Sequence, residues 1–331
     1  MQRRTFLAAM RYLSWIVLAG AMSVARAAPE QFPTRPVRLI VPNVPGGATD
    51  TIARQLQSKL GELWGQPIIV DNRAGASGGI AFALAAKAPP DGYTLLVSSV
   101  SITIVETTLA KTLGATPSRD LTGITCVMQV PHVFVVNPSV PAASVGAMVD
   151  HVKKTGARLN FATAAIGTYT QLDAIRFLRA AGIDMTVVPY KGGAGQFIAA
   201  LLGNEAQAAM VNLASSIAHI RGGRMKVLAT TWPSRRPELP EVPTMAESGF
   251  PGIGTNAWNG LFAPAKMPKA LLARIHSDVA KVMDTAATRE QLAKQMIAVV
   301  VSKSPDEFNA LLDEERKKWR QVVVENNINV Q

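Results

Sequence analysis

Cysteine is almost absent from this sequence, since Cys126 is the single one in 331 residues. No disulfide can form within the chain, and a chain of this length can bury a sufficient apolar core without one. Cys126 lies in the apolar stretch ITCVMQV, which contains no histidine. We therefore predict a small buried core residue and no catalytic thiol.

Histidine is also scarce, and its positions do not fit the common metal-binding patterns. No two of the four histidines are spaced four residues apart, and no loop is rich in aspartate and glutamate. The nucleotide-binding patterns GxxxxGK[ST] and GxGxxG are missing as well. The sequence therefore predicts no metal site and no cofactor.

Basic residues outnumber acidic ones, 34 to 23, but they form no continuous basic segment. The densest cluster, Arg316-Lys317-Lys318, directly follows Asp313-Glu314-Glu315. No basic stripe alternates with aromatic residues, so we do not predict nucleic-acid binding. A positive net charge suits anionic small molecules, although charge by itself defines no site.

The longest apolar run lies near the N-terminus and is too short to span a bilayer. It extends from Tyr12 to Ala25, about 14 residues, whereas a spanning helix needs ~20. Arg3 and Arg4 precede it and Ala25-Arg26-Ala27 follows it, an order typical of a secretory signal peptide. We expect residues 1–27 to be a cleaved leader and the protein to be periplasmic, with the Sec and twin-arginine routes both open. Loss of the leader's four arginines lowers the formal net charge from +11 to +7.

The rest of the chain repeats one local pattern four times. A short apolar run is followed by a loop rich in glycine and small residues, and then by a helical segment rich in alanine and leucine. The apolar runs begin at Arg38, Pro67, Leu159 and Val187. Strands that alternate with helices in this way predict parallel βαβ units and an α/β fold.

The spacing of these units predicts two similar lobes. Two units lie before residue 100 and two lie after residue 155. Residues 130–145 cross between the lobes, and we expect a second crossing near residues 258–272. The first lobe would be discontinuous, comprising residues 28–130 and 256–331, and the second would comprise residues 131–255. Two lobes joined in this way imply a cleft between them.

Glycine-rich loops between strand and helix are potential anion-binding sites. The N-terminal N–H groups of a helix carry partial positive charge, and glycine lets a ligand approach the backbone closely. Gly46-Gly47-Ala48-Thr49 has this form, with Thr49 or Asp50 as the expected helix cap. Four loops of this kind, with ends facing one cleft, favour a ligand-binding role over plain turns.

Ser77 lies in Gly75-Ala76-Ser77-Gly78-Gly79, which also fits the GxSxG pattern of serine hydrolases. A nucleophile elbow requires the serine directly at a strand end, with a histidine and an acid downstream. Residues 71–74 separate this motif from its strand, and no histidine lies in the loop setting that a general base usually occupies. We therefore expect Ser77 to be a hydrogen-bond donor, and a secreted hydrolase that uses Ser77 is the alternative.

The C-terminal segment predicts an amphipathic helix that packs on the core. Ser304-Pro305-Asp306-Glu307 forms a capping box at its start. The apolar residues that share one face of this helix are Phe308, Leu311, Leu312, Trp319 and Val322.

Long motifs along the chain resemble those of the substrate-binding receptors of tripartite tricarboxylate transporters, the Bug family. The matching segments are FPTRPVRLIVPNVPGGATDTIAR, VDNRAGASGGIAFALAAKAPPDGYTLL, VVPYKGGAG, IAHIRGGRMKVLATT and RRPELPEVPTMAESGFPG. Their order agrees with the family over nearly the whole exported chain. The resemblance implies a two-lobed periplasmic binding protein of type II, the Venus-flytrap fold, which closes on a small organic carboxylate.

The resemblance also implies which residues bind the ligand. In the family, two loops of the first lobe hold one carboxylate through backbone N–H groups and ordered water; here these are Gly46, Gly47, Ala48 and Thr49, and Ala76, Ser77 and Gly78. The other implied ligand-binding residues are Ser98, Ser99, Gly167, Thr168, Tyr169, Thr170, Lys191 and Asn212. The chain departs from its relatives at Tyr169 and Val211, which hint at an apolar or aromatic acid rather than an amino acid.

The resemblance implies a binding protein and no enzyme. By family analogy its partners are the carboxylate and the subunits of a membrane permease, and we expect a monomer. A sensor that passes the ligand to a signalling protein remains an alternative on the same fold.

Overall fold

The structure is a computed structural model that describes residues 32–46, 48–109, 113–164, 166–190 and 194–325. The chain divides into two compact units, Met1–Thr34 and Arg35–Gln331, and the following description concerns the second. The predicted leader, Gly47 and Lys191 lie outside the described residues. No helix within the described ranges combines the length and the apolar character needed to cross a membrane.

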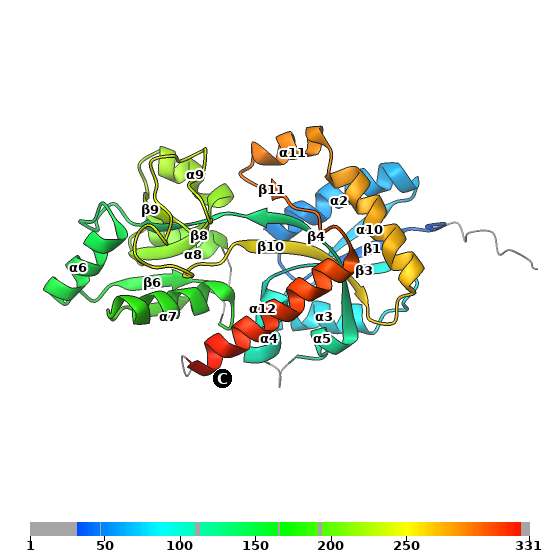
Figure 1. Cartoon of the computed structure of the whole chain (residues 1–331), viewed down its shortest axis with the longest axis horizontal. Helices are drawn as coiled ribbons and strands as arrows, with labels where there is room; N and C mark the ends of the chain where they lie inside the picture. Colours follow the sequence, from blue (N-terminus) through cyan, green and yellow to red (C-terminus); the bar gives the residue numbers. More distant parts are fainter. Residues whose placement is uncertain (1–31, 47, 110–112, 165, 191–193, 326–331) are drawn as a thin grey trace, which may run out of the picture. The chain divides into compact units, whose positions relative to one another are not determined.

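A six-stranded sheet contains most of the N-terminal strands (Figure 1), in the order β11-β4-β10-β3-β1-β2. Its strands are β1 (Val37–Val41), β2 (Ile68–Asn72), β3 (Thr94–Ser99), β4 (Leu121–Val130), β10 (Ala257–Pro264) and β11 (Ala298–Val299). Strand β1 pairs in parallel with β2 and β3, whereas β10 lies antiparallel between β3 and β4. Because β1, β2 and β3 are parallel, their carboxyl ends lie at the same edge of the sheet.

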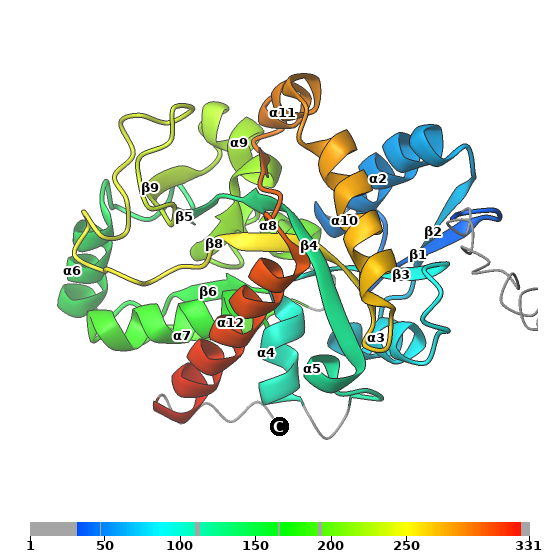
Figure 2. The same cartoon turned by 45° about the vertical axis from the view of Figure 1, so that its right-hand side comes forward.

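Two groups of helices pack against this sheet. Helix α2 (Ala48–Trp64) contacts β1, β2, β3 and α10 (Lys269–Met283). The second group shares one apolar cluster with Ile40 and Leu96, and comprises α3 (Gly79–Ala86), α4 (Ser101–Thr108) and α12 (Pro305–Glu325). Figure 2 shows α12 lying along α4 and α10 lying beside α2, as their contacts require. Two short helices, α5 (Pro117–Asp120) and α11 (Ala286–Ala293), complete this part.

Helix α12 confirms the amphipathic helix predicted from the sequence. The N–H of Glu307 donates to Ser304 Oγ at 3.1 Å, which is one half of the capping box. Phe308, Leu312, Trp319 and Val322 are buried, and Leu311 packs partly buried beside them. The apolar face of the helix therefore faces the core of the first sheet.

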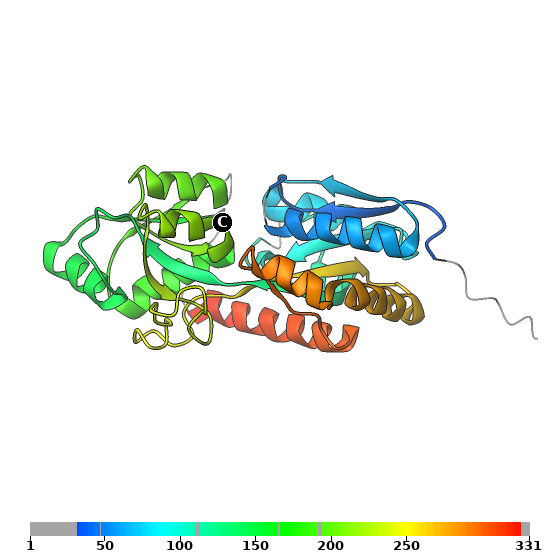
Figure 3. The same ribbon diagram turned by 90° about the horizontal axis from the view of Figure 1, so that it is seen from above.

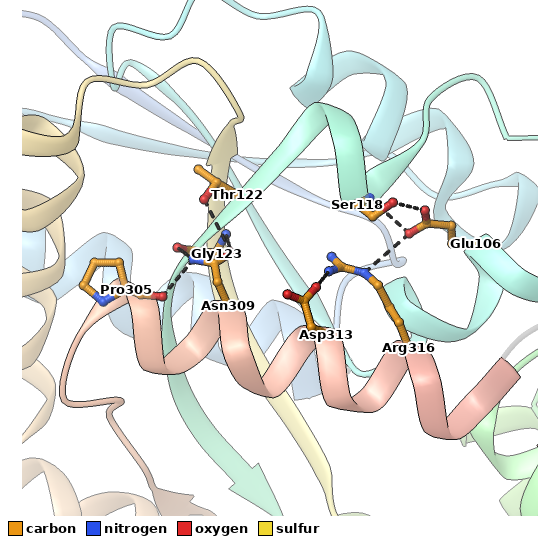
Figure 4. A network of polar contacts seen from close by, with 8 residues as sticks. All are labelled: Glu106, Ser118, Thr122, Gly123, Pro305, Asn309, Asp313 and Arg316. Carbon is orange, nitrogen blue, oxygen red and sulfur yellow. Dashed lines mark hydrogen bonds and ion pairs between the residues drawn. The ribbon is translucent and has the colours of Figure 1, made fainter. Parts of the chain in front are cut away.

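A polar network fixes the other contacts of α12 (Figure 4). Asn309 accepts from the N–H of Gly123 at 3.0 Å and donates through Nδ2 to the Gly123 carbonyl at 2.9 Å, so it binds both backbone groups of this β4 residue. Arg316 lies 2.7 Å from Asp313 and 3.6 Å from Glu106 of α4. The Glu106 carboxylate in turn accepts from the N–H of Ser118. The network ties α12, α4, α5 and β4 together.

A five-stranded sheet has the order β7-β6-β8-β5-β9. Its strands are β5 (His132–Val136), β6 (Asn160–Thr163), β7 (Thr186–Pro189), β8 (Ala208–Asn212) and β9 (Lys226–Thr230). Strand β6 pairs in parallel with β7 and β8, whereas β5 runs antiparallel to β8 and β9. The carboxyl ends of β6, β7 and β8 therefore share one edge.

Alternation along β5 divides the core of this sheet into two layers. Phe134 and Val136 join the cluster beneath α6 (Val145–Thr155) and α7 (Tyr169–Ala181). Val133 and Val135 point to the opposite face, as expected for successive residues of a strand. They join the cluster formed with α8 (Ala194–Leu202) and α9 (Leu213–Arg221).

The chain crosses between the two sheets at two adjacent places. Pro131 alone separates β4 from β5, and Ala257 at the start of β10 pairs with Val130. The second crossing was expected near residues 258–272 but lies just before them, because β10 pairs along its whole length within the first sheet. Below, the first lobe means the six-stranded sheet with its helices, and the second lobe means the five-stranded sheet with its helices. The exact lobe boundaries remain a prediction.

One further segment of the first lobe contacts the second. Strand β11 pairs with β4, yet Met296, two residues before it, is buried in the second-lobe cluster with Val211 and Leu213. Figure 3 shows this α11–β11 connection next to the second-lobe helices. Met296 has a φ of 59°, a left-handed conformation that is unusual for a residue other than glycine.

Candidate functional site

The predicted site residues occupy the carboxyl ends of parallel strands in both lobes. Gly46, Ala48 and Thr49 follow β1, Ala76–Gly78 follow β2, and Ser98 and Ser99 end β3. In the second lobe, Gly167, Thr168, Tyr169 and Thr170 follow β6, and Asn212 ends β8. Parallel strands bring these residues to one edge of each sheet, which is where ligands bind in open α/β sheets.

Two contacts bring these edges together across the lobes. Ser77 Oγ lies 3.5 Å from the carbonyl oxygen of Ile166, and Thr108 Oγ1 lies 3.4 Å from that of Gly167. A Cβ at Gly167 would lie 2.9 Å from Thr108 Oγ1, closer than real Cβ atoms approach. The loop after β6 therefore approaches the first lobe closely enough to require glycine at position 167.

The turn after β2 has an unusual backbone. Gly75, Ala76, Ser77 and Gly78 have φ values of 128°, 47°, 52° and 97°. Four consecutive residues thus lie in the region that favours glycine, although two of them carry side chains. A short 3₁₀ turn, η1 (Ala76–Gly78), closes with a 2.9 Å bond from the N–H of Gly78 to the carbonyl of Gly75. The turn directly precedes α3, so it presents backbone groups at a helix start.

Asp50 holds the loop between β1 and α2. Its carboxylate accepts from the N–H of Gly46 and from Asn72 Nδ2, each at 3.0 Å, and it pairs with Arg54 at 2.8 Å. Burial by itself would raise the pKa of Asp50, but Arg54 and the two donors outweigh burial and lower it. The side chain is therefore ionised near neutral pH and fixes the loop at Gly46.

Thr49 supports the same loop from inside. Helix α2 begins at Ala48, slightly before the predicted cap at Thr49 or Asp50. Thr49 Oγ1 donates instead to Asn259 Oδ1 of β10 at 2.8 Å, and both residues are buried. The hydroxyl of Thr49 thus anchors the helix start to the sheet.

The two serines at the end of β3 differ in their surroundings. Ser99 Oγ accepts from the N–H of Ser101 at 3.4 Å. Ser98 is 1% exposed, and its hydroxyl has no hydrogen-bond partner among the described residues. Ser98 therefore has unused hydrogen-bonding capacity beside the site. A buried hydroxyl without a partner is energetically costly.

Tyr169 was predicted to line the ligand site, and the structure joins its hydroxyl to His132. The Tyr169 oxygen lies 2.9 Å from His132 Nε2, while His132 Nδ1 lies 3.1 Å from the Val130 carbonyl. A carbonyl only accepts, so Nδ1 carries the proton and Tyr169 donates to Nε2. Burial lowers the pKa of His132 to about 4 and raises that of Tyr169, so both groups are neutral.

The remaining residues of the second-lobe loop bind mainly to one another. Gln171 Oε1 accepts from the N–H of Gly167 at 2.8 Å, and Thr170 Oγ1 accepts from that of Ala164 at 3.0 Å and lies 3.0 Å from Thr168 Oγ1. Asn212 Oδ1 caps α9 by accepting from the N–H of Ser215 at 2.7 Å.

Val211 is fully buried in the core cluster beneath α8 and α9. The Tyr169 hydroxyl binds His132, and the preference for an apolar or aromatic acid stays a prediction.

A pocket of about 270 Å³ opens between the lobes next to these residues. It is lined by Gly46 and Thr51 of the first lobe, by Asn212 and the start of α9 in the second, and by residues 294–297. The sequence did not indicate residues 294–297, because they follow no strand–glycine–helix pattern.

The structure provides little support for hydrolase or metal chemistry in the described part of the chain. Ser77 Oγ lies near a carbonyl oxygen, that of Ile166, whereas His132 bonds to Tyr169 and His276 lies 2.7 Å from the Ser302 carbonyl. No cluster of three potential metal ligands occurs among the described residues. Cys126 is buried, and burial raises the pKa of its thiol to about 12, as expected for an unreactive core residue.

Two α/β lobes, joined at adjacent crossings and facing each other through glycine-rich strand ends, define a two-lobed periplasmic binding protein fold. Comparison with protein families agrees with this class. The model of the tripartite tricarboxylate transporter family receptor matches residues 52–328. The chain belongs to this family.

Individual relatives cover almost the whole chain. BugT of Bordetella pertussis is 33% identical over 311 residues, which span 94% of this chain and 95% of BugT. The solved structure of R. palustris Rpa4515 with adipate has a TM-score of 0.83 at 30% identity and covers 90% of this chain and 99% of that one. The periplasmic binding protein BugD has a TM-score of 0.81 at 26% identity, with coverages of 91% and 100%.

Proposed function

We propose that this protein is a periplasmic receptor that captures a small organic carboxylate between its lobes and delivers it to a membrane permease. The observation that carries the proposal is the turn at Gly75–Gly78, with four positive φ values at the start of a helix. Backbone strain of this kind is retained where a ligand or a mechanism uses it.

The chemistry of the facing loops suits an anionic oxygen ligand. The loops after β1 and β2 lie at the N-terminal ends of α2 and α3, where the helix dipole favours negative charge. Ionised Asp50 is already neutralised by Arg54 and by backbone and amide donors, so it does not oppose an incoming carboxylate as a free charge would. The adipate bound by Rpa4515 supports the same ligand class for this chain.

One carboxylate is proposed to bind to the two first-lobe loops, with Ser98 and Ser99 beside them. The residues of these loops are Gly46, Ala48, Thr49, Ala76, Ser77 and Gly78. The second-lobe loop from Gly167 to Thr170, together with Asn212, would complete the site on closure. Ligand binding must favour the closed arrangement over the open one, since a ligand shifts an equilibrium only by its differential affinity.

Transport rather than catalysis is the proposed role. Family membership supports a permease of the tripartite tricarboxylate type as the partner, and its periplasmic relative BugD supports the location. The chain itself is proposed to work as a monomer without a cofactor.

The test is a thermal-shift screen of the purified protein, unfolded and refolded to remove any bound ligand. Di- and tricarboxylates, acidic amino acids and aromatic acids are each compared with their amides. A ligand at about 100 times its Kd should add roughly 2.7 kcal/mol of stability. An acid that raises Tm while its amide does not supports the proposal.

A natively refolded protein that no acid stabilises would contradict it. Ester or amide turnover that disappears in Ser77→Ala would instead establish the hydrolase.

A further inference from the structure

The turn that ends α11 carries a methionine at a position that favours glycine. The N–H of Met296 donates to the Ala293 carbonyl at 2.9 Å. The N–H of Ile297 donates to the Leu292 carbonyl at 3.0 Å. These two bonds define a Schellman motif, which places residue 296 in the left-handed conformation, and Met296 has a φ of 59°. Glycine usually occupies this position because it adopts the conformation without strain.

Other turns of this chain form the same motif with the expected residues. The same pair of bonds closes turns in which the left-handed residue is Gly182, Gly223 or Gly249. A further turn of this kind has Asn204 at a φ of 60°, and asparagine is the residue that sometimes replaces glycine there. The geometry of the turn therefore gives no reason for methionine at position 296.

The side chain of Met296 supplies that reason. It is 9% exposed and belongs to the apolar cluster of the second lobe, with Val211 and Leu213, although the following strand β11 pairs with β4 of the first lobe. Methionine is unbranched and flexible, so it can fill a gap in a core built by another element. Backbone strain is retained where the surrounding structure uses it, and here it accompanies a contact between the lobes.

Open space lies directly beside this contact. The pocket of about 270 Å³ is lined by Met296, by Gly46 and Thr51 of the first lobe, and by the start of α9 in the second. The packing around Met296 is therefore incomplete on the side of the first-lobe loops. The lobes can separate at this place, but separation exposes the methionine side chain and its place in the second-lobe core to water.

We propose that Met296 is a latch between the lobes, meaning a first-lobe side chain whose burial in the second-lobe core holds the lobes together in the ligand-free protein. The inference rests on one step of the proposed receptor function, the closing of the two lobes, and not on the identity of the ligand. A ligand that needs the closed arrangement binds with an apparent affinity proportional to the fraction of protein already closed. Met296 is thus a positioning residue that acts on affinity through this fraction.

The test measures the separation of the lobes by pulsed electron spin resonance on the full-length protein, expressed with its own leader, purified and refolded without ligand. Spin labels are attached at Lys154→Cys in α6 of the second lobe and at Ser277→Cys in α10 of the first, both exposed positions. Cys126 does not compete for the label, because it is buried and burial raises the pKa of its thiol to about 12.

We expect the labelled parent protein to show a short-distance population. Met296→Gly should lower the ratio of short to long distances about tenfold, the value of one buried methionine side chain. Met296→Ala, which keeps a strained turn, should open the lobes to the same extent, since the missing side chain and not the relaxed backbone is the cause. Met296→Leu keeps an apolar side chain of similar volume and should stay within about threefold of the parent.

Asn204→Gly is the matched control. It relieves the same left-handed conformation in the same kind of turn, but Asn204 is exposed and lies between α8 and β8 within the second lobe. The control should leave the distances unchanged. Circular dichroism checks that every variant is folded before its distances are compared.

The outcomes distinguish the latch from the receptor function. If Met296→Gly and Met296→Ala leave the distances unchanged, the latch is wrong, and acids of the thermal-shift panel that stabilise the wild type leave the receptor function standing. An equal opening in Asn204→Gly would also overturn the latch, because glycine itself would then be the cause. If the Met296 variants open the lobes and no panel acid stabilises the wild type, the latch stands and the receptor function fails.

Discussion

At the residue scale, backbone strain is concentrated in the turn after β2. Ala76 and Ser77 are two adjacent residues with side chains at positive φ. Each such residue costs about 1–2 kcal/mol relative to an ordinary conformation. Gly75 and Gly78 on either side avoid that cost, and the bond between them closes the turn. The turn therefore keeps its shape because the glycines confine the strain to two positions.

Gly78→Ala should destabilise the protein by roughly 2–4 kcal/mol. Alanine at a φ of 97° is strained, and its Cβ would lie 2.7 Å from Cζ of Phe82, which is 1% exposed and has little room to move. Urea unfolding measures the loss, with the m-value expected to stay constant.

Gly223→Ala is the matched control for backbone strain. Gly223 also has a positive φ, 68°, but a Cβ there meets nothing within 4 Å. Its replacement should cost about 1 kcal/mol, the strain without the overlap. Equal losses for the two variants would show that Phe82 gives way and that only the backbone matters.

The sequence predicted the positions of the glycine turns but not the tertiary contacts of the residues around the site. The GxSxG pattern at Gly75–Gly79 gave the position of the turn because glycine spacing is local. Tyr169 was assigned to the ligand site by the family resemblance, which could not show that its hydroxyl binds His132 of β5. Met296 was not predicted at all, since its pocket forms only when α11, β11 and α9 come together.

At the element scale, all four predicted strand–loop–helix units are present, as β1–α2, β2–α3, β6–α7 and β7–α8. Their apolar runs and glycines are short-range signals, so the sequence carries them directly. The place of β10 between β3 and β4 was not predictable in this way. It depends on pairs such as Phe262 with Leu96, whose separation along the chain no local pattern records.

Asn309→Ala should detach α12 from β4 and cost roughly 1–3 kcal/mol. The side chain binds both the N–H and the carbonyl of Gly123, and Nδ2 also donates to the Pro305 carbonyl at 2.7 Å. Alanine leaves these partly buried backbone groups without their partner, and unpaired groups carry the full desolvation cost. Urea unfolding of the wild type and the variant gives the difference.

Two companion variants identify the cause. Asn309→Asp keeps an acceptor for the Gly123 N–H but places an oxygen against two carbonyls, so it should be no more stable than the alanine variant. Gln321→Ala, on the exposed side of the same helix, should stay within about 0.5 kcal/mol of the wild type. An aspartate variant as stable as the wild type would show that the donated bonds are unimportant.

At the scale of the whole molecule, a neutral polar pair of the second lobe lies next to the crossing from the first lobe. His132 begins β5 directly after the Pro131 crossing, and Tyr169 begins α7 of the second lobe. Leu172 of the same helix is buried in the first-lobe cluster, and Tyr169 packs against that cluster. The pair thus lies where the chain passes from one sheet to the other, and its hydrogen bonds require an uncharged imidazole.

Stability should therefore fall as the pH falls from about 6.5 toward 4. The folded pKa of His132, about 4, lies below its ordinary value of 6.5, so between these values only the unfolded chain binds the proton. The contribution is complete above pH 6.5 and is lost through this window. It amounts to roughly 2 kcal/mol between pH 7 and pH 5. Asp173, whose pKa is raised by burial, acts with the opposite sign and offsets part of this loss.

His132→Asn separates the two contributions, because it removes the imidazole and retains Asp173. Urea unfolding at pH 7 and pH 5 gives, for each protein, the loss of unfolding free energy on acidification. This loss should be smaller in the variant than in the wild type by about 2 kcal/mol. The variant will also be less stable at pH 7, since Tyr169 loses its acceptor, but that loss is common to both pH values. If the variant loses as much stability on acidification as the wild type, the pH dependence of stability arises elsewhere and not from His132.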